Sequence, residues 1–124
     1  MFELSKQFAF DAAHTLDRKI QTEGSRRIHG HSYRAEVTIR GSADPVSGMV
    51  MDLGLFERML QATRDALDHH FLDDVADLGP ATLENLSAWI WRRLVPDCPA
   101  LFCVAVYRDS SGDACRYYGP DRSS

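Results

Sequence analysis

The chain has 124 residues, 44% of them hydrophobic and 26% charged, and its formal net charge at pH 7 is -4. This length and composition predict one globular domain with a real core, and the mild acidity argues against a nucleic-acid partner. No apolar run approaches membrane-spanning length, and no charged-then-apolar leader is visible, so we expect no membrane partner. Three cysteines without a C-x-x-C spacing favour a cytoplasmic location.

Two strands are predicted first. Residues 2–14 alternate apolar and polar side chains, a pattern that Lys6 alone interrupts, and this is typical of a half-buried strand. Residues 32–40 alternate more cleanly, with the apolar side chains at odd positions from Tyr33 to Ile39.

Two helices and two short strands follow. Apolar residues at helical spacing predict helices over 53–67 and 83–94, with Asp52 and Thr82 as N-caps. Strands are expected over 101–108 and 114–118, joined by a DSSGD turn.

This order of elements, ββααββ, predicts an α+β fold. A four-stranded antiparallel sheet should carry both helices on one face. Residues 1–124 are expected to form a single domain, with a loose tail from about residue 120. Such a sheet has open edges and a partly uncovered face, and subunit association is one way to protect both.

The segment HGHSY places His29 and His31 on the same predicted strand face as Tyr33, and His14 shares the face of Phe10. If these strands pair, the three imidazoles extend the apolar face and can converge on a zinc ion with a fourth position open. Gly30 is expected to let the backbone bend and to keep bulk away from this site. The alternative is a set of hydrogen-bonded core histidines, and the spacing alone leaves both interpretations open.

A second cluster lies in the segment LDHHFL. Asp68 beside His69 and His70 is either a solvated loop after a helix or an Asp–His pair, in which the carboxylate fixes the imidazole tautomer and raises its basicity. The sequence pattern does not decide between the two.

Five separated motifs carry a family resemblance. They are FAFDAAH, RRIHGHSY, ADPVSGMVMDL, LDHHFL and PATLENLSAWIW, and together they span nearly all residues from 8 to 118. In this order they resemble the 6-pyruvoyltetrahydropterin synthase and 6-carboxytetrahydropterin synthase family, the second being the queuosine-pathway branch.

The resemblance implies a T-fold that trimerises into a barrel and doubles to a hexamer, a dimer of trimers with its sites at subunit interfaces. It also implies zinc on His14, His29 and His31, catalysis by Asp68 and His69, and 7,8-dihydroneopterin triphosphate as substrate. Arg26 and Arg27, with Arg18 and Lys19, flank the histidine segment and are candidates to attract the triphosphate.

The chain departs from the family pattern at two positions. Ser25 stands where the family has its catalytic cysteine, and an alcohol is a far weaker acid than a thiol. The family also has a glutamate in the third strand that holds the pterin ring. Arg108 occupies the equivalent position here, and Asp109 is the nearest carboxylate and the candidate for that role.

The sequence is therefore compatible with three functions. The sequence favours a zinc-dependent, 6-carboxytetrahydropterin synthase-like lyase that acts on 7,8-dihydroneopterin triphosphate or a related dihydropterin. The alternatives are a zinc- and pterin-binding homologue without catalysis or with altered chemistry, which Ser25 favours, and an unrelated structural domain.

Overall fold

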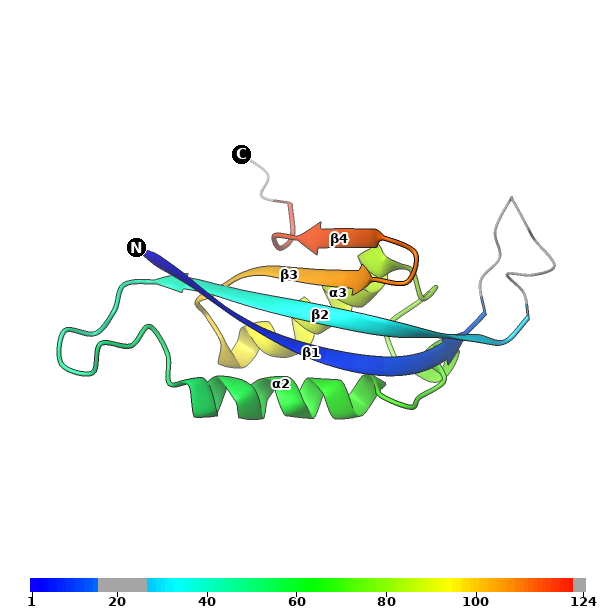
Figure 1. Ribbon diagram of the computed structural model, residues 1–124, viewed down its shortest axis with the longest axis horizontal. Helices are drawn as coiled ribbons and strands as arrows, with labels where there is room; N and C mark the ends of the chain where they lie inside the picture. Colours follow the sequence, from blue (N-terminus) through cyan, green and yellow to red (C-terminus); the bar gives the residue numbers. More distant parts are fainter. Residues whose placement is uncertain (16–26, 122–124) are drawn as a thin grey trace.

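The computed structural model describes residues 1–15 and 27–121, in which a four-stranded antiparallel sheet with the order β1-β2-β3-β4 carries both α-helices on one face (Figure 1). The strands are β1 (Phe2–His14), β2 (His29–Gly41), β3 (Leu101–Arg108) and β4 (Asp113–Tyr117). Helices α2 (Leu53–Leu67) and α3 (Leu83–Leu94) lie between β2 and β3 in the chain, with two short 3-10 turns at Leu72–Asp74 and Val95–Asp97. The predicted ββααββ fold is confirmed.

The two long strands pair along their whole length. Their register matches Phe2 with Gly41 at one end and His14 with His29 at the other. Successive side chains of each strand point to opposite faces of the sheet. The rings of Phe10 and Tyr33 stack inside the core with their centres 4.9 Å apart, while their neighbours in sequence face outward. Strand β2 begins at His29, three residues earlier than the alternation predicted, so both of its histidines are part of the sheet.

Each helix begins at the predicted cap. The Asp52 side chain accepts a hydrogen bond from the backbone N–H of Leu55 at 3.0 Å, and Thr82 accepts one from Asn85 at 3.1 Å. These caps satisfy N–H groups that a helix leaves without an intrahelical partner.

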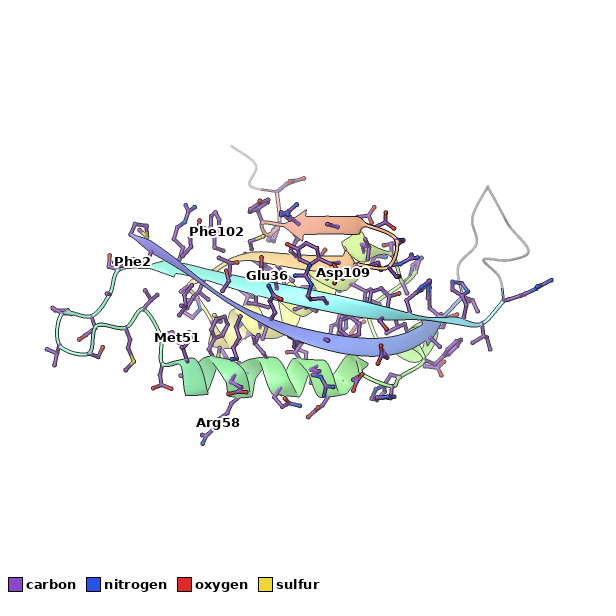
Figure 2. All side chains as sticks on the ribbon, viewed as in Figure 1. Phe2, Glu36, Met51, Arg58, Phe102 and Asp109 are labelled. Carbon is purple, nitrogen blue, oxygen red and sulfur yellow. The ribbon has the colours of Figure 1, made fainter. Side chains whose placement is uncertain are left out.

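The apolar stripe of each helix packs on the sheet, α2 against β1 and α3 against β3 and β4. On α2 the inner face holds Phe56 and Leu60, while Arg58 points away from the sheet (Figure 2). Neither helix in the described ranges has the length and apolar character needed to cross a membrane.

The helix-covered face holds the core, and it continues to the end of the sheet where β1 and β2 carry their histidines. Phe2 and Met51 lie toward the opposite end (Figure 2). A site built from the histidines therefore borders the core on one side and the end of the sheet on the other.

Candidate active site

Three histidines gather at the end of the β1–β2 pair. His14 and His29 are cross-strand partners with ring centres 4.5 Å apart, and the ring of His31 lies 5.0 Å from that of His14 and 4.9 Å from that of His29. One ring nitrogen from each lies within 4.8 Å of those of the other two. The predicted convergence of the three imidazoles is confirmed, because strand parity and register put them on one face.

His14 shows that this cluster fits a metal. Its side chain is 2% exposed, and within residues 1–15 and 27–121 both of its buried ring nitrogens lack a hydrogen-bond partner. A buried polar group without a partner costs about 1–3 kcal/mol. A metal ion that accepts the nitrogen lone pair removes part of this cost, and imidazole nitrogens are preferred ligands of zinc.

The charge state of the histidines suits metal binding. Burial lowers the pKa of His14, and the neighbouring His29 lowers it further. Burial, followed by the positive charge of Arg108, lowers the pKa of His31 to about 4. Both imidazoles are therefore neutral near pH 7, which is the form that coordinates a metal.

His29 is oriented by the backbone. Its Nδ1 donates a hydrogen bond to the carbonyl oxygen of Arg27 at 2.7 Å. A ring nitrogen that donates in this way leaves Nε2 as the lone-pair nitrogen, and such a bond fixes the ring of a metal ligand.

Gly30 separates the two histidines of β2. A Cβ built there would meet the Ala12 carbonyl oxygen at 3.7 Å, an ordinary contact, and the residue has no positive φ. The described part of the chain therefore leaves room for a side chain at this position, and the role expected of Gly30 at the site stays a prediction.

The Asp68–His69 pair lies along the outer edge of β1, where the loop after α2 bonds to the strand backbone. Asp68 ends α2, and its Oδ2 lies 3.0 Å from His69 Nδ1 and 3.0 Å from Arg64 Nη2. The backbone N–H of Asp11 donates to Oδ1 at 2.9 Å. The Asp11 N–H, and after it the hydrogen bond from His69, hold the pKa of the Asp68 carboxyl below its usual value. The carboxylate is thus charged and held in place.

His69 is presented to solvent in an uncommon backbone conformation. Its φ is 58°, in the left-handed region, and its backbone N–H donates to the Asp11 carbonyl oxygen at 2.7 Å. The side chain is 79% exposed. With Nδ1 held by Asp68, the Nε2 atom is the one available to exchange a proton with a substrate.

A groove of about 480 Å³ has one residue of each cluster, His31 and His69, in its lining. His31 and Gly30 line it from β2, and His69, His70 and Phe71 line it from the loop after α2. The ligand atoms of the histidine cluster and those of Asp68 and His69 nevertheless form two separate groups among the described residues. A larger cavity of about 610 Å³ lies near Trp89 and Arg92, and His14, His29 and His31 are not among the residues lining it.

The four other predicted site residues have different outcomes. Ser25 and Arg26 lie outside the described residues. Arg27 is exposed and meets the cluster through its carbonyl oxygen. Asp109 is bound by Arg34 through two bonds of 3.0 Å, and it lies on the sheet face opposite the three histidines. The structure therefore does not bring Asp109 to the histidine cluster.

Two residues near the cluster received no role from the sequence. Asp73 accepts hydrogen bonds from the backbone N–H and the hydroxyl of Thr15, the residue after His14. Arg108 lies on the core face of β3, and its buried Nε has no hydrogen-bond partner in the part of the chain that the structure describes. The sequence could have placed Arg108 on this face, because it follows the buried Val104 and Val106 at alternate positions of the strand. No residue pattern around Asp73 predicts its contact with Thr15.

Comparison with known proteins shows which family this chain belongs to. Residues 3–120 match the model of the 6-pyruvoyl tetrahydropterin synthase family. A 6-carboxy-5,6,7,8-tetrahydropterin synthase from Synechocystis sp. is 35% identical over 97% of this chain and 95% of its own length. The 6-pyruvoyl tetrahydrobiopterin synthase of Homo sapiens is 36% identical over 85% of this chain and 83% of its own.

Solved structures share the fold. The 6-pyruvoyl tetrahydropterin synthase of Caenorhabditis elegans superposes with a TM-score of 0.82 at 24% identity over 96% of each chain. That of Plasmodium falciparum superposes with a TM-score of 0.72 at 16% identity, over 94% of this chain and 98% of its own. Together with the match over nearly the whole sequence, these likenesses show that the chain has the T-fold and belongs to the 6-pyruvoyl tetrahydropterin synthase family of pterin synthases.

Proposed function

We propose that this chain is a zinc-dependent lyase that acts on 7,8-dihydroneopterin triphosphate or a related dihydropterin, in the manner of a 6-carboxytetrahydropterin synthase. The observation that carries the proposal is His14, whose two buried ring nitrogens have no partner although two further imidazoles converge beside it. The match to a pterin synthase family supports the substrate class. The queuosine pathway and a cytoplasmic location are part of the proposal, and the free thiols of Cys98, Cys103 and Cys115 are consistent with the latter.

His14, His29 and His31 would hold the zinc ion through one nitrogen each. The chemistry that zinc supplies when bound is Lewis acidity, which makes protons near the substrate's hydroxyl groups easier to remove. Three protein ligands leave a coordination position for substrate, and the groove beside His31 offers a route to the cluster.

His69 is the proposed acid and base. Asp68 accepts a hydrogen bond from the Nδ1–H of His69 and so fixes the tautomer in which Nε2 carries the lone pair. The bonds from Arg64 and Asp11 hold the carboxylate, so that the pair stays aligned while Nε2 takes up and returns a proton.

Assembly into a homo-oligomer, a hexamer built as a dimer of trimers, belongs to the same proposal. The sheet ends in two edge strands, β1 and β4, and its outer face carries no helix (Figure 1). Unpaired strand edges favour pairing with another chain. Association would also allow the exposed His69 of one copy to meet a substrate held at the histidines of another.

The second candidate is a zinc- and pterin-binding homologue without catalysis or with altered chemistry. It is favoured by Ser25, which stands in the sequence where the family resemblance implies a cysteine. A serine hydroxyl is a poor base and a poor acid near neutral pH compared with a thiol.

One experiment separates the two candidates. The purified protein is incubated with 7,8-dihydroneopterin triphosphate, with and without a trap for acetaldehyde, and the products are identified by mass. Conversion that disappears in Asp68→Asn supports the lyase. The matched control is Asp65→Asn, which removes an exposed carboxylate three residues earlier on the same helix. Binding of the pterin without any product supports the second candidate instead.

A further inference from the structure

Arg108 is the last residue of β3, and it shares the sheet face of the three histidines. Val104 and Val106 precede it at alternate positions and are fully buried in the core. Tyr107 and Asp109, on either side of Arg108, both meet Arg34 on the opposite face, where the Arg34 guanidinium lies 3.9 Å from the Tyr107 ring centre. Alternation along a strand therefore directs the Arg108 side chain toward the helix-covered side.

The strand register puts Arg108 next to the histidine cluster. Arg34 pairs with Tyr107, and continuing the antiparallel pairing by one residue places Tyr33 opposite Arg108. The Tyr33 ring lies 5.9 Å from the ring of His31. The positive charge of Arg108 lowers the pKa of His31, as described above, and it also lowers that of His14.

Carboxylates close to Arg108 in the fold have other partners. Asp113 is its cross-strand neighbour on β4, but the Asp113 carboxylate accepts from the Ser111 hydroxyl at 2.9 Å. Asp109 is bound to Arg34, and Asp73 near His14 is bound to Thr15. Among residues 1–15 and 27–121 Arg108 takes part in no ion pair, and its Nε is buried without any hydrogen bond.

A guanidinium in this position has a defined ligand chemistry. It offers N–H donors in a planar fork and no acceptor, so it cannot pair with the amino or ring N–H groups of a ligand. Its best partner is an oxyanion with two acceptor oxygens, either a carboxylate or a phosphate. The side chains next to Arg108 include the imidazoles of His31 and His14, which, unlike a carboxylate, cannot form an ion pair with the guanidinium.

We infer that Arg108 is a specificity-determining residue that binds an oxyanion of the substrate, a carboxylate or a phosphate, at the end of β3 beside the histidine cluster. This inference rests on the proposed function for the location of the substrate, and it adds the requirement that the substrate be anionic where it faces β3. Neutral dihydropterins would offer Arg108 only uncharged acceptors, which form weaker hydrogen bonds with a guanidinium than an oxyanion does.

The test measures equilibrium binding with four probes. These are neutral 7,8-dihydroneopterin, 7,8-dihydroneopterin triphosphate, 6-carboxypterin and inorganic triphosphate, each titrated into the purified full chain by calorimetry. The variants are Arg108→Met and Arg108→Lys, and the matched control is Arg116→Met. Arg116 is a cation on β4 that pairs with Ala105, on the face opposite Arg108. Zinc content and the thermal unfolding midpoint confirm that each variant is folded.

We expect Arg108→Met to weaken binding of an anionic probe by about tenfold or more, because a hydrogen-bonded charge pair is lost, and to leave neutral 7,8-dihydroneopterin within about twofold. Loss for both triphosphate probes identifies a phosphate as the partner, and loss for 6-carboxypterin identifies a carboxylate. Arg108→Lys should keep part of the affinity, and Arg116→Met should change none of the four.

Equal weakening of neutral and anionic pterins in Arg108→Met overturns the inference, as does an equal effect of Arg116→Met. If Arg108→Met does not fold, Arg108→Lys decides, because loss of two-point binding should still weaken the anionic probes selectively. Failure of the proposed function has a different signature: no pterin is bound, while inorganic triphosphate still binds in an Arg108-dependent way. Absence of binding for all four probes contradicts both.

Discussion

His14 on β1 and His29 on β2 are direct cross-strand partners, with ring centres 4.5 Å apart, at the last paired position of the two long strands. This pairing places the two side chains on the same face, and His31 completes the cluster from two residues further along β2. Among the described residues neither ring nitrogen of His14 has a hydrogen-bond partner, so the cluster fits a ligand that accepts lone pairs.

Removing one of these ligands should remove the metal and leave the fold. We expect His31→Ala to lower bound zinc from about one per chain to a small fraction of that, because two imidazoles hold the ion far less tightly than three. The thermal unfolding midpoint of the metal-free protein should change little, because His31 is only partly buried. Metal analysis by mass spectrometry is the measurement. His69→Ala, in the separate cluster, is the control, and equal zinc in wild type and His31→Ala would defeat the assignment.

Asp73 should strengthen zinc binding indirectly, by holding the backbone next to the ligand His14. It holds the backbone N–H and hydroxyl of Thr15, and so fixes the chain directly after His14. We expect Asp73→Ala to weaken zinc binding by about tenfold, as loss of an orienting group does at other metal centres. Competition with a chelator measures this change. Asp74→Ala is the matched control, and equal zinc affinity in the two variants would show that the Thr15 bonds play no part.

Asp68 should link stability to pH. Its carboxyl has a lowered pKa in the folded chain, so its contribution to the free energy of unfolding is present above the ordinary carboxyl pKa and is lost as the pH falls through the lowered value. Asp68→Asn should therefore be less stable than wild type near pH 7, and the difference should shrink in acid. Denaturant unfolding at several pH values checks this. A difference that stays constant into acid, or one that Asp65→Asn reproduces, would contradict it.

The chain should assemble. The edges at β1 and β4 and the uncovered outer face of the sheet favour association, so we expect a trimer or a hexamer in solution. Light scattering at micromolar concentration distinguishes these from a monomer of 14.0 kDa. A stable monomer would count against both the ring and the proposed shared sites.

Substitutions at Ser25 and at His69 should change turnover in opposite directions. We expect Ser25→Cys to raise 6-carboxytetrahydropterin synthase activity, because a thiol is far more acidic than an alcohol. His69→Ala should abolish the turnover that exists, since general acid–base catalysis typically contributes about a hundredfold or more. Product formation from 7,8-dihydroneopterin triphosphate is the measurement. Full activity in the wild type that Ser25→Cys leaves unchanged would place the base elsewhere, with Glu23 and His70 as the next residues to test.

Local patterns in the sequence determined the elements and the metal-ligand candidates. Alternation in β1 and β2 sets which side chains face the core, so the shared parity of His14 with Phe10 and of His31 with Tyr33 already predicted one cluster. The caps at Asp52 and Thr82 were predictable for a similar reason, because each bonds to an N–H three residues away.

The tertiary structure decided what depends on contacts between distant segments. The sequence offered Asp109, directly after the third strand, as the nearest carboxylate. Pairing of β2 with β3 binds it to Arg34 on the outer face and leaves Arg108 on the histidine side. Asp73 reaches Thr15, and Asp68 reaches Asp11, across more than fifty residues of chain. Side-chain parity and helix caps follow from neighbours within a few residues, so the sequence alone determines them, whereas strand register and the contacts of the loop after α2 exist only once the chain has folded.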